Sequence, residues 1–515
     1  MDYLTNGVDI GISESHTTPR YCNNLISADT RAGKEQLQQQ MIKETTAGRR
    51  AGPFATIPFS NIQFSPIGTV PKKNSTKLRV IHHLSYPRDL SNSSINSQIE
   101  DIECEYLAFS TVCNQIVKLG KGCLLSKFDI NDAFRYIRVR KDQHYCLGMC
   151  FKGLYYYERV LPFGLKSAPA LFELFATAIN RFITYAGVAY IYHYMDDFIC
   201  VSTLQTALAE YDITLKMFEQ LNIALSKDKL QAPTTRIEFL GLIIDTQLMQ
   251  VQLPEDKLIR YRTELAQWRH KHTATRPEVQ SLLGKLVHAS RAIQHGRTFY
   301  QHLLQQLREY NASTSHGELS ITHYSHEDIN WWFHFIAAWN GISMIPPSLD
   351  QYLQPHQHQL YTDACLTGMG ALYNNSQYSL HAWEAKELAA AQRHARISMP
   401  YLELLALVHS LNIWSGELSG KALIVNCDCM PVVQAVNRGR SFDPGMMNLL
   451  RTLTYITCTN NIYIHCQHIA GITNIHADLL SRSISDQEFL QQPQWNGVVL
   501  LRKFIRPLPI PDWFN

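Results

Sequence analysis

The stretch YIYHYMDDFICVS, from Tyr190 to Ser202, constrains the fold of this chain more than any other segment. Its aromatic and β-branched residues favour a strand, yet Asp196 and Asp197 stand side by side within it. An unpaired carboxylate is costly to bury, so a single buried strand would not tolerate the pair. We therefore predict a β-hairpin with the two aspartates at its exposed turn, facing a cleft.

A third aspartate belongs with this pair. Asp129 ends the apolar, strand-like run CLLSKFDI. If the two strands are neighbours, the three carboxylates converge, and like charges held that close require a cation. Mg²⁺ prefers oxygen ligands, commonly carboxylates together with substrate phosphates, and two such ions stabilise both reacting oxygens of a phosphoryl transfer. A lone aspartate is more often a cap or turn residue, but two such sites together argue against that reading.

The composition sets the class of protein. At 515 residues the chain exceeds a single core, and we expect about three to four domains. The hydrophobic content of 45% indicates a folded protein, and the 12 scattered cysteines indicate a reducing compartment. No apolar run reaches the ~18–20 residues of a membrane span, and the N-terminus lacks signal-peptide features. We expect an intracellular protein of the cytoplasm or nucleus, with no membrane partner.

The periodicity of the chain predicts a mixed α/β architecture over residues 51–245. Residues 167–183 should form a helix with Ser167 at its cap and Pro169 in its first turn, and residues 203–221 an amphipathic helix. KEQLQQQMIKET is typical of a solvated helix, 251–310 of basic helices, and 343–359 of a linker. The net charge of +3 is too small to indicate nucleic-acid binding by itself.

Five segments around the aspartates resemble the motifs of reverse transcriptases, in the order found in that family. HYMDDF resembles the YxDD motif and FDINDAF the first aspartate motif. One departure is His83, which stands where many relatives carry an aspartate. The other three are the fingers segment SPIGTVPKKNSTKLRVIHHLSYP, the template and nucleotide segment LPFGLKSAPALF, and the primer-grip hairpin IEFLGLIID.

The resemblance implies roles for the acidic residues and one lysine. Asp129 and Asp196 would bind two Mg²⁺ ions, with Mn²⁺ as a substitute, and Asp197 would be a weaker or supporting ligand. Lys229 would be the general acid for the leaving pyrophosphate, with Lys227 as the alternative.

The resemblance also implies a dNTP pocket. Lys72, Lys73 and Arg79 would hold the triphosphate, for which the forked guanidinium of arginine is well suited. Phe134 would block a ribose 2′-hydroxyl and so disfavour RNA synthesis. The alternative without a functional role is that Phe134 belongs to the core and that Lys72 and Lys73 form a solvated turn. Phe163, Gly164 and Leu165 would shape the pocket.

A second acidic set lies near the C-terminus, one residue on each of four successive elements. The set is Asp363, Glu403, Asp428 and Asp478, with glycines after the first. It resembles the RNase H tetrad, which implies two more Mg²⁺ ions and cleavage of the RNA strand in an RNA–DNA hybrid. His468 would assist proton transfer or product release, whereas His476 would be structural. Strand alternation should turn the thiols of Cys427 and Cys429 away from Asp428, as small buried side chains.

The resemblance implies a right-hand polymerase joined to an RNase H-like domain. The partners would be an RNA template, a DNA primer, RNA–DNA hybrid and dNTPs. The segments look most like DIRS-type or Ngaro-like elements, which encode a recombinase; a gypsy-like or pararetroviral polymerase, or an inactive nucleic-acid-binding protein, are alternatives. The expected parts are an N-terminal extension (1–50), fingers and palm (51–250), thumb (251–310), connection (311–358), RNase H (359–485) and tail (486–515).

Overall fold

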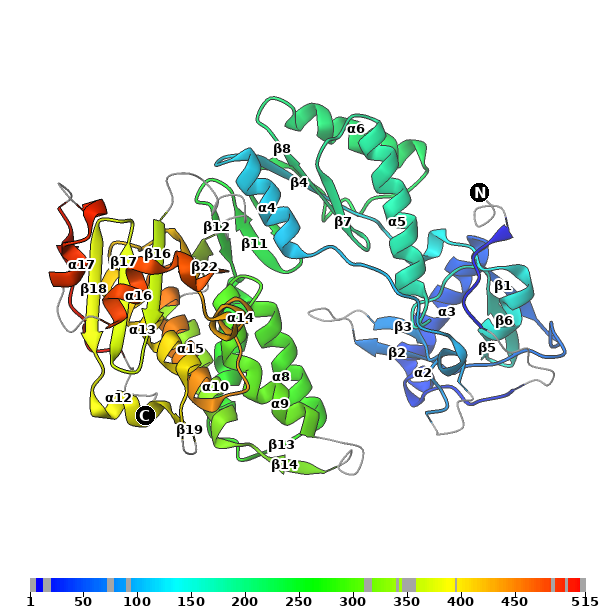
Figure 1. Cartoon of the computed structure of the whole chain (residues 1–515). Coiled ribbons are helices and arrows are strands. Elements are labelled where there is room, and N and C mark those ends of the chain that lie inside the picture. Colours follow the sequence, from blue (N-terminus) through cyan, green and yellow to red (C-terminus); the bar gives the residue numbers. More distant parts are fainter. Residues whose placement is uncertain are drawn as a thin grey trace. The chain divides into compact units, whose positions relative to one another are not determined.

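The computed structural model divides into two units (Figure 1). Unit 1 comprises Met1–Ala108 and Leu124–Thr234, and unit 2 comprises Phe109–Cys123 and Thr235–Asn515. The expected mixed α/β class is confirmed, while the six-part division stays a prediction. The described residues are 6–12, 20–71, 78–88, 94–309, 317–339, 342–344, 358–393, 396–482, 487–495 and 499–509.

The centre of unit 1 is an antiparallel four-stranded sheet in the order β7-β8-β4-β9. Its core contains Phe128, Phe198 and Phe218, whose side chains are fully buried. Two helices, α5 and α6, pack against this core. The bounds are β4 (Leu124–Asp129), α5 (Ala168–Tyr185), β7 (Ile191–Tyr194), β8 (Asp197–Ser202), α6 (Ala207–Gln220) and β9 (Gln231–Thr234).

Both helices differ in detail from expectation. Ser167 is the N-cap of α5, but its backbone is already helical (φ −80°, ψ −14°) and its side chain makes no capping bond. A capping side chain normally needs an extended backbone. Helix α6 starts later than expected, and Leu204 and Leu208 are exposed. The apolar spacing at its N-terminal end therefore does not mark a buried face.

The other part of unit 1 surrounds an N-terminal helix that is less solvated than expected. Helix α3 buries Leu37, Met41 and Glu44, because one of its faces packs on the strands β1, β2 and β3. The elements are α2 (Ile26–Asp29), α3 (Arg31–Thr46), β1 (Arg50–Phe54), β2 (Ile67–Pro71), β3 (Leu78–His82), η1 (Asn96–Gln98), η2 (Ala133–Tyr136), η3 (Lys141–Leu147), β5 (Gly148–Phe151) and β6 (Leu154–Glu158).

Unit 2 begins with helices and a small sheet in the order β10-β11-β12-β15. The expected hairpin is present: β10 and β11 pair around Leu240 and Gly241, both at positive φ. The elements are α4 (Phe109–Leu119), β10 (Arg236–Phe239), β11 (Leu242–Asp245), β12 (Gln250–Gln252), α7 (Glu255–Trp268), β13 (Thr273–Thr275), α8 (Arg276–Ala289), η4 (Gln294–Tyr300), α9 (Gln301–Glu309), β14 (Glu318–Ser320), α10 (His323–Trp339) and β15 (Ile342–Met344).

The C-terminal part of unit 2 is a six-stranded sheet in the order β22-β21-β16-β17-β18-β23. Helices α13 and α16 both pack on β16 and β17. They cover opposite faces, because Ala371 joins the core beneath α13 while its neighbour Leu372 joins the core with Leu480 of α16. The strands are β16 (His358–Ala364), β17 (Gly368–Tyr373), β18 (Gln377–Ala382), β21 (Ala422–Cys427), β22 (Tyr463–His468) and β23 (Leu501–Arg502).

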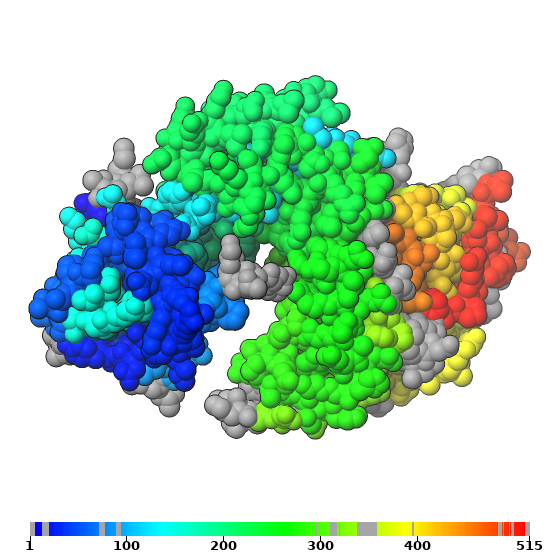
Figure 2. All heavy atoms as spheres, turned by 180° about the vertical axis from the view of Figure 1, so that it is seen from behind, coloured from blue at the N-terminus to red at the C-terminus, as the bar shows by residue number. Residues whose placement is uncertain are grey.

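The C-terminal residues close the edge of this sheet, since β23 pairs with β18. Figure 2 shows the red residues near the C-terminus beside yellow residues of unit 2. None of the helices in the described ranges is both long and apolar enough for a membrane span. The remaining elements are α12 (Ala385–Ala391), β19 (Gln392–Arg393), β20 (Arg396–Ile397), α13 (Met399–Trp414), α14 (Met430–Arg438), α15 (Pro444–Thr459), η6 (Gly471–Thr473), α16 (Ile475–Arg482), α17 (Gln487–Leu490) and η7 (Pro493–Trp495).

Candidate active sites

The aspartate pair lies where β7 turns into β8, as the hairpin prediction requires. Tyr194 pairs with Asp197, so Met195 and Asp196 form a two-residue turn. Met195 has φ 52°, the left-handed conformation that such turns require at their first position. Its N–H donates to the buried Glu173 carboxylate at 2.9 Å, which holds this conformation. The pair is half-buried rather than exposed, and only Asp196 is within the turn.

The structure brings the third aspartate to the same place. Asp129 is directly opposite Asp197 in the antiparallel β4–β8 pair, and the Ile130 N–H donates to the Asp196 carbonyl at 3.0 Å. Lys229 donates from Nζ to Asp129 Oδ2 at 2.8 Å. Lys127, on the same face of β4, has its Nζ 3.1 Å from Asp197 Oδ1. Three carboxylates and two ammonium groups therefore share one surface of the sheet.

The charges in this cluster are not balanced. Burial raises the pKa of Asp196, and the neighbouring Asp197 and Asp129 carboxylates raise it further. Burial also raises the pKa of Asp197, against the opposing effect of Lys127. Burial tends to lower the pKa of Lys229, but Asp129 outweighs it and the pKa is raised. A divalent cation would relieve the repulsion between these oxygen donors, so the residues fit Mg²⁺ chemically.

The residues expected to form the dNTP pocket are partly described. Phe134 has its ring centroid 5.2 Å from that of Phe163 and 5.7 Å from that of Phe172. Gly164 has φ 105°, and a Cβ there would collide with the His82 carbonyl oxygen, so this position needs glycine. Arg79 is exposed on β3. Lys72 and Lys73 lie outside the described residues.

The second acidic set gathers at one end of the six-stranded sheet. Asp363 is near the end of β16, Asp428 directly follows β21, and Glu403 is on α13. A carboxylate oxygen of Glu403, one of Asp428 and the thiol of Cys427 all lie within 4.8 Å of one another. Asp363 accepts a hydrogen bond of 2.5 Å from the Ser481 hydroxyl.

The electrostatics of this set also favour a cation. Burial raises the pKa of Asp363 to about 6, with further contributions from Asp428 and Asp478. Burial raises the pKa of Glu403 to about 9, assisted by Asp363 and Asp428. Glu403 Oε2 is buried and has no hydrogen-bond partner among the described residues. Buried polar atoms rarely stay unsatisfied, so a bound cation would supply what this oxygen lacks.

Asp478, the fourth residue of this set, and His468 lie at its rim. Asp478 is on α16, where its Oδ1 accepts a hydrogen bond of 2.7 Å from Arg482 Nε. Helix α16 comes close because β17 presents Gly370 beneath it, where a Cβ would be 2.5 Å from the Ser481 nitrogen. His468 is exposed at the end of β22, beside Cys427 in the neighbouring strand. His476 packs against Trp495, with ring centroids 5.0 Å apart.

The expected placement of the Cys427 thiol was wrong. The Cys427 thiol is near the carboxylates of Glu403 and Asp428 rather than on the opposite face. Strand alternation fails here because β21 ends at Cys427, so Asp428 lies in a bend and Cys429 is the N-cap of α14. Cys427 is nevertheless fully buried, and burial raises its pKa.

Three site residues were missed by the sequence analysis: Lys127, Glu173 and Ser481. Lys127 could have been predicted from the sequence, because strand alternation places it on the same face as Asp129. Glu173 and Ser481 act on residues distant in sequence, so no local pattern indicates them.

The basic helices of residues 251–310 carry less free positive charge than their composition indicates. Lys257 pairs with Glu238, Lys271 with Glu278 and Lys285 with Glu264. These lysines are therefore poorer candidates for phosphate contacts than the count of basic residues implies.

Comparison with known proteins bears directly on the first site. Residues 70–244 match the family described as reverse transcriptase (RNA-dependent DNA polymerase). The chain is 24% identical over 462 residues to polyprotein P3 of Commelina yellow mottle virus, covering 87% of this chain and 22% of that protein. It is 22% identical over 469 residues to the transposon Tf2-3 polyprotein of Schizosaccharomyces pombe, covering 88% and 31% respectively.

The chain spans less than a third of the length of these relatives. It carries a reverse transcriptase domain of the retrotransposon and retroviral polyprotein type. Among solved structures, it is similar to the foamy viral protease–reverse transcriptase in complex with double-stranded DNA, with a TM-score of 0.51 and 17% identity, over 89% of this chain and 87% of that one. This likeness shows a polymerase fold.

Proposed function

We propose that this chain is an RNA- and DNA-templated DNA polymerase that also cleaves the RNA strand of RNA–DNA hybrids. The observation that carries the proposal is that two carboxylate clusters stand on separate sheets, one of them within the reverse transcriptase domain. One cluster suffices for nucleotide addition, so a second, independent cluster calls for a second phosphodiester reaction. A polymerase that copies RNA leaves a hybrid, and hybrid cleavage frees the new strand for copying.

In the polymerase site, Asp129 and Asp196 would hold two Mg²⁺ ions, with Asp197 in support and Mn²⁺ as a substitute. The ions would supply Lewis-acid stabilisation of the attacking and leaving oxygens. Lys229, whose pKa is raised beside Asp129, keeps a proton that it can donate to the leaving pyrophosphate. Lys127 would hold Asp197 in place.

In the dNTP pocket, Phe134 would exclude a ribose 2′-hydroxyl, and Phe163 and Gly164 would line the walls around the nucleotide. Arg79, with Lys72 and Lys73, would contact the triphosphate.

In the nuclease site, Asp363, Glu403, Asp428 and Asp478 would hold a second pair of Mg²⁺ ions. The exposed position of His468 suits proton transfer to and from solvent. Ser481 orients Asp363. Hybrids approach A-form geometry, which proteins contact through the backbone and 2′-hydroxyls, so binding should be insensitive to sequence and should weaken steeply with salt.

Primer extension on an RNA template with dNTPs and Mg²⁺ tests the polymerase. Asp196→Asn should abolish extension and leave hybrid cleavage, whereas Asp428→Asn should do the reverse. Chelation by EDTA should stop both activities. Extension that survives Asp196→Asn would refute the assignment of the active site. Salt-dependent hybrid binding by a wild-type chain that neither extends nor cleaves would favour the inactive nucleic-acid-binding alternative.

We also propose an origin in a DIRS-type or Ngaro-like element, with a recombinase as a further partner and an intracellular location. A tyrosine recombinase gene beside the coding sequence would support this origin. An integrase gene there would favour the gypsy-like alternative.

A further inference from the structure

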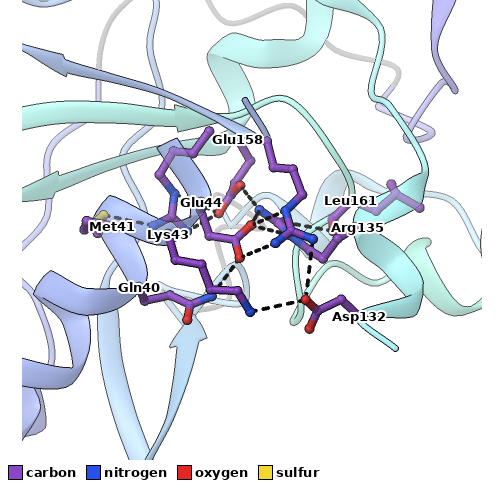
Figure 3. Close-up of polar contacts among 10 residues, drawn as sticks. Gln40, Met41, Lys43, Glu44, Asp132, Arg135, Glu158 and Leu161 are labelled. Atoms are coloured by element: carbon purple, nitrogen blue, oxygen red, sulfur yellow. Dashed lines mark hydrogen bonds and ion pairs between the residues drawn. The ribbon is translucent and has the colours of Figure 1, made fainter. Parts of the chain in front are cut away.

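A buried cluster of charged residues joins the N-terminal helix α3 to the turn that follows Asp129 (Figure 3). Glu44 of α3 accepts two hydrogen bonds on Oε2 from Arg135, at 3.0 Å from Nε and 2.7 Å from Nη2. Arg135 also donates to Glu158 Oε2 at 2.7 Å and to the Leu161 carbonyl at 3.2 Å. Glu44 is 2% exposed and Arg135 8%, so water screens these contacts little.

A second contact holds the other end of the same turn. Lys43 of α3 has its Nζ 3.3 Å from Asp132 Oδ2, and Arg49 contacts the same oxygen at 3.5 Å from Nη1. Asp132 has φ 54°, a conformation that a side chain other than glycine adopts only at a cost. These ion pairs offset that cost. Helix α3 therefore contacts the turn on both sides of Phe134, at Asp132 and at Arg135.

Phe134 therefore lies between two residues that contact α3, but its own side chain takes no part in the charged cluster. It follows Ala133 within η2 (Ala133–Tyr136), between the two residues that α3 holds. Its ring leaves the charged cluster and lies against Phe163 and Phe172. A shift of the η2 backbone would move this ring, because Phe134 is one of the four residues of η2.

Helix α3 also lies outside the residues that match the reverse transcriptase family, which begin at 70. Among the described residues, Arg135 forms ion pairs with Glu44 of α3 and with Glu158 of the matched domain. One of the two carboxylates that contact Arg135 in the described residues therefore comes from a helix N-terminal to the matched domain.

We propose that Glu44 is a positioning residue for the sugar of the incoming nucleotide: through Arg135 it fixes the turn that carries Phe134. This inference rests on the proposed polymerase function. It makes the N-terminal helix a determinant of the choice between dNTP and rNTP, in addition to a contributor to stability.

The test compares Glu44→Gln with Glu35→Gln. Glu35 is on the same helix, but its ion pair with Arg31 is solvent-exposed, so the control repeats the chemical change without disturbing the cluster. Two quantities are measured: hydrogen exchange of the Arg135 and Ile137 amides, which bond within the turn, and the ratio of kcat/KM for dNTP to that for rNTP.

Glu44→Gln should speed exchange at both amides and lower the selectivity ratio about tenfold, the equivalent of one charge-assisted hydrogen bond. Glu35→Gln should change neither. Lys43→Met, at the more exposed end of the clamp, should act in the same direction with a smaller effect, and it serves if Glu44→Gln fails to fold.

Unchanged exchange would overturn the inference. Faster exchange with an equal loss of dNTP and rNTP use would also overturn it, because the contact would then serve stability alone. A wild-type chain that extends no primer would instead refute the proposed function, and the exchange measurement would decide by itself whether α3 holds the turn.

Discussion

Replacing Gly370 by alanine tests whether close packing of α16 on β17 builds the nuclease site. A Cβ at this position would lie 2.4 Å from both the Ala477 carbonyl oxygen and Leu480 Cβ, and 2.5 Å from the Ser481 nitrogen. Ordinary contact begins at 3.4 Å, so the two shortest contacts fall short by about 1.0 Å. Two of these three atoms belong to the helix backbone and cannot rotate away, so α16 itself must move.

That movement should reduce hybrid cleavage while the fold is kept. Asp478 is on α16, and Ser481 of the same helix orients Asp363, so both sides of the site shift together. A misplacement of about 1 Å can cost about 100-fold in rate, whereas overpacking typically costs about 1–3 kcal/mol. Primer extension should be unchanged, because Asp129 and Asp196 are on another sheet.

The assay measures hybrid cleavage and primer extension by the same preparation, with thermal unfolding to show that the fold is kept. Gly416→Ala is the matched control, since a Cβ there meets nothing within 4 Å. Cleavage by Gly370→Ala at the wild-type rate, with the fold intact, would refute the reasoning.

Three further predictions concern two buried ion pairs and the residue expected to exclude the ribose 2′-hydroxyl. Burial would raise the pKa of Glu158, but Arg50 and Arg135 outweigh it and lower the pKa to about 2 from 4.5. The shift contributes about 3 kcal/mol to the free energy of unfolding above pH 4.5, and this contribution is lost as the pH falls toward 2. Urea unfolding at pH 7, 4 and 2.5 should show the gap to Glu158→Gln closing, and a constant gap would contradict this. Arg451→Met should cost about 3–5 kcal/mol in urea unfolding, because it leaves the fully buried Asp328 without its cation; a cost below about 1 kcal/mol would show that the pair contributes little. Phe134→Ala should admit rNTPs in extension assays, and an unchanged dNTP preference would remove Phe134 as the gate.

Much of the first site could be predicted because its signals are local. Alternating apolar residues around two adjacent aspartates indicate a hairpin, and Asp129 at the end of another strand indicates its partner. The same reasoning failed for Cys427, because alternation holds only while a strand continues and β21 ends at that residue.

The sequence by itself determined which residues carry the charge and which backbone segments present them, since hairpins and strand ends depend on neighbours a few positions apart. Only the tertiary structure decided which charges meet. Glu173 holds the Met195 turn, Lys127 pairs with Asp197, and Glu44 reaches Arg135 across the fold. These contacts depend on strand register and on how helices pack, and residues distant in sequence leave no local pattern that specifies either.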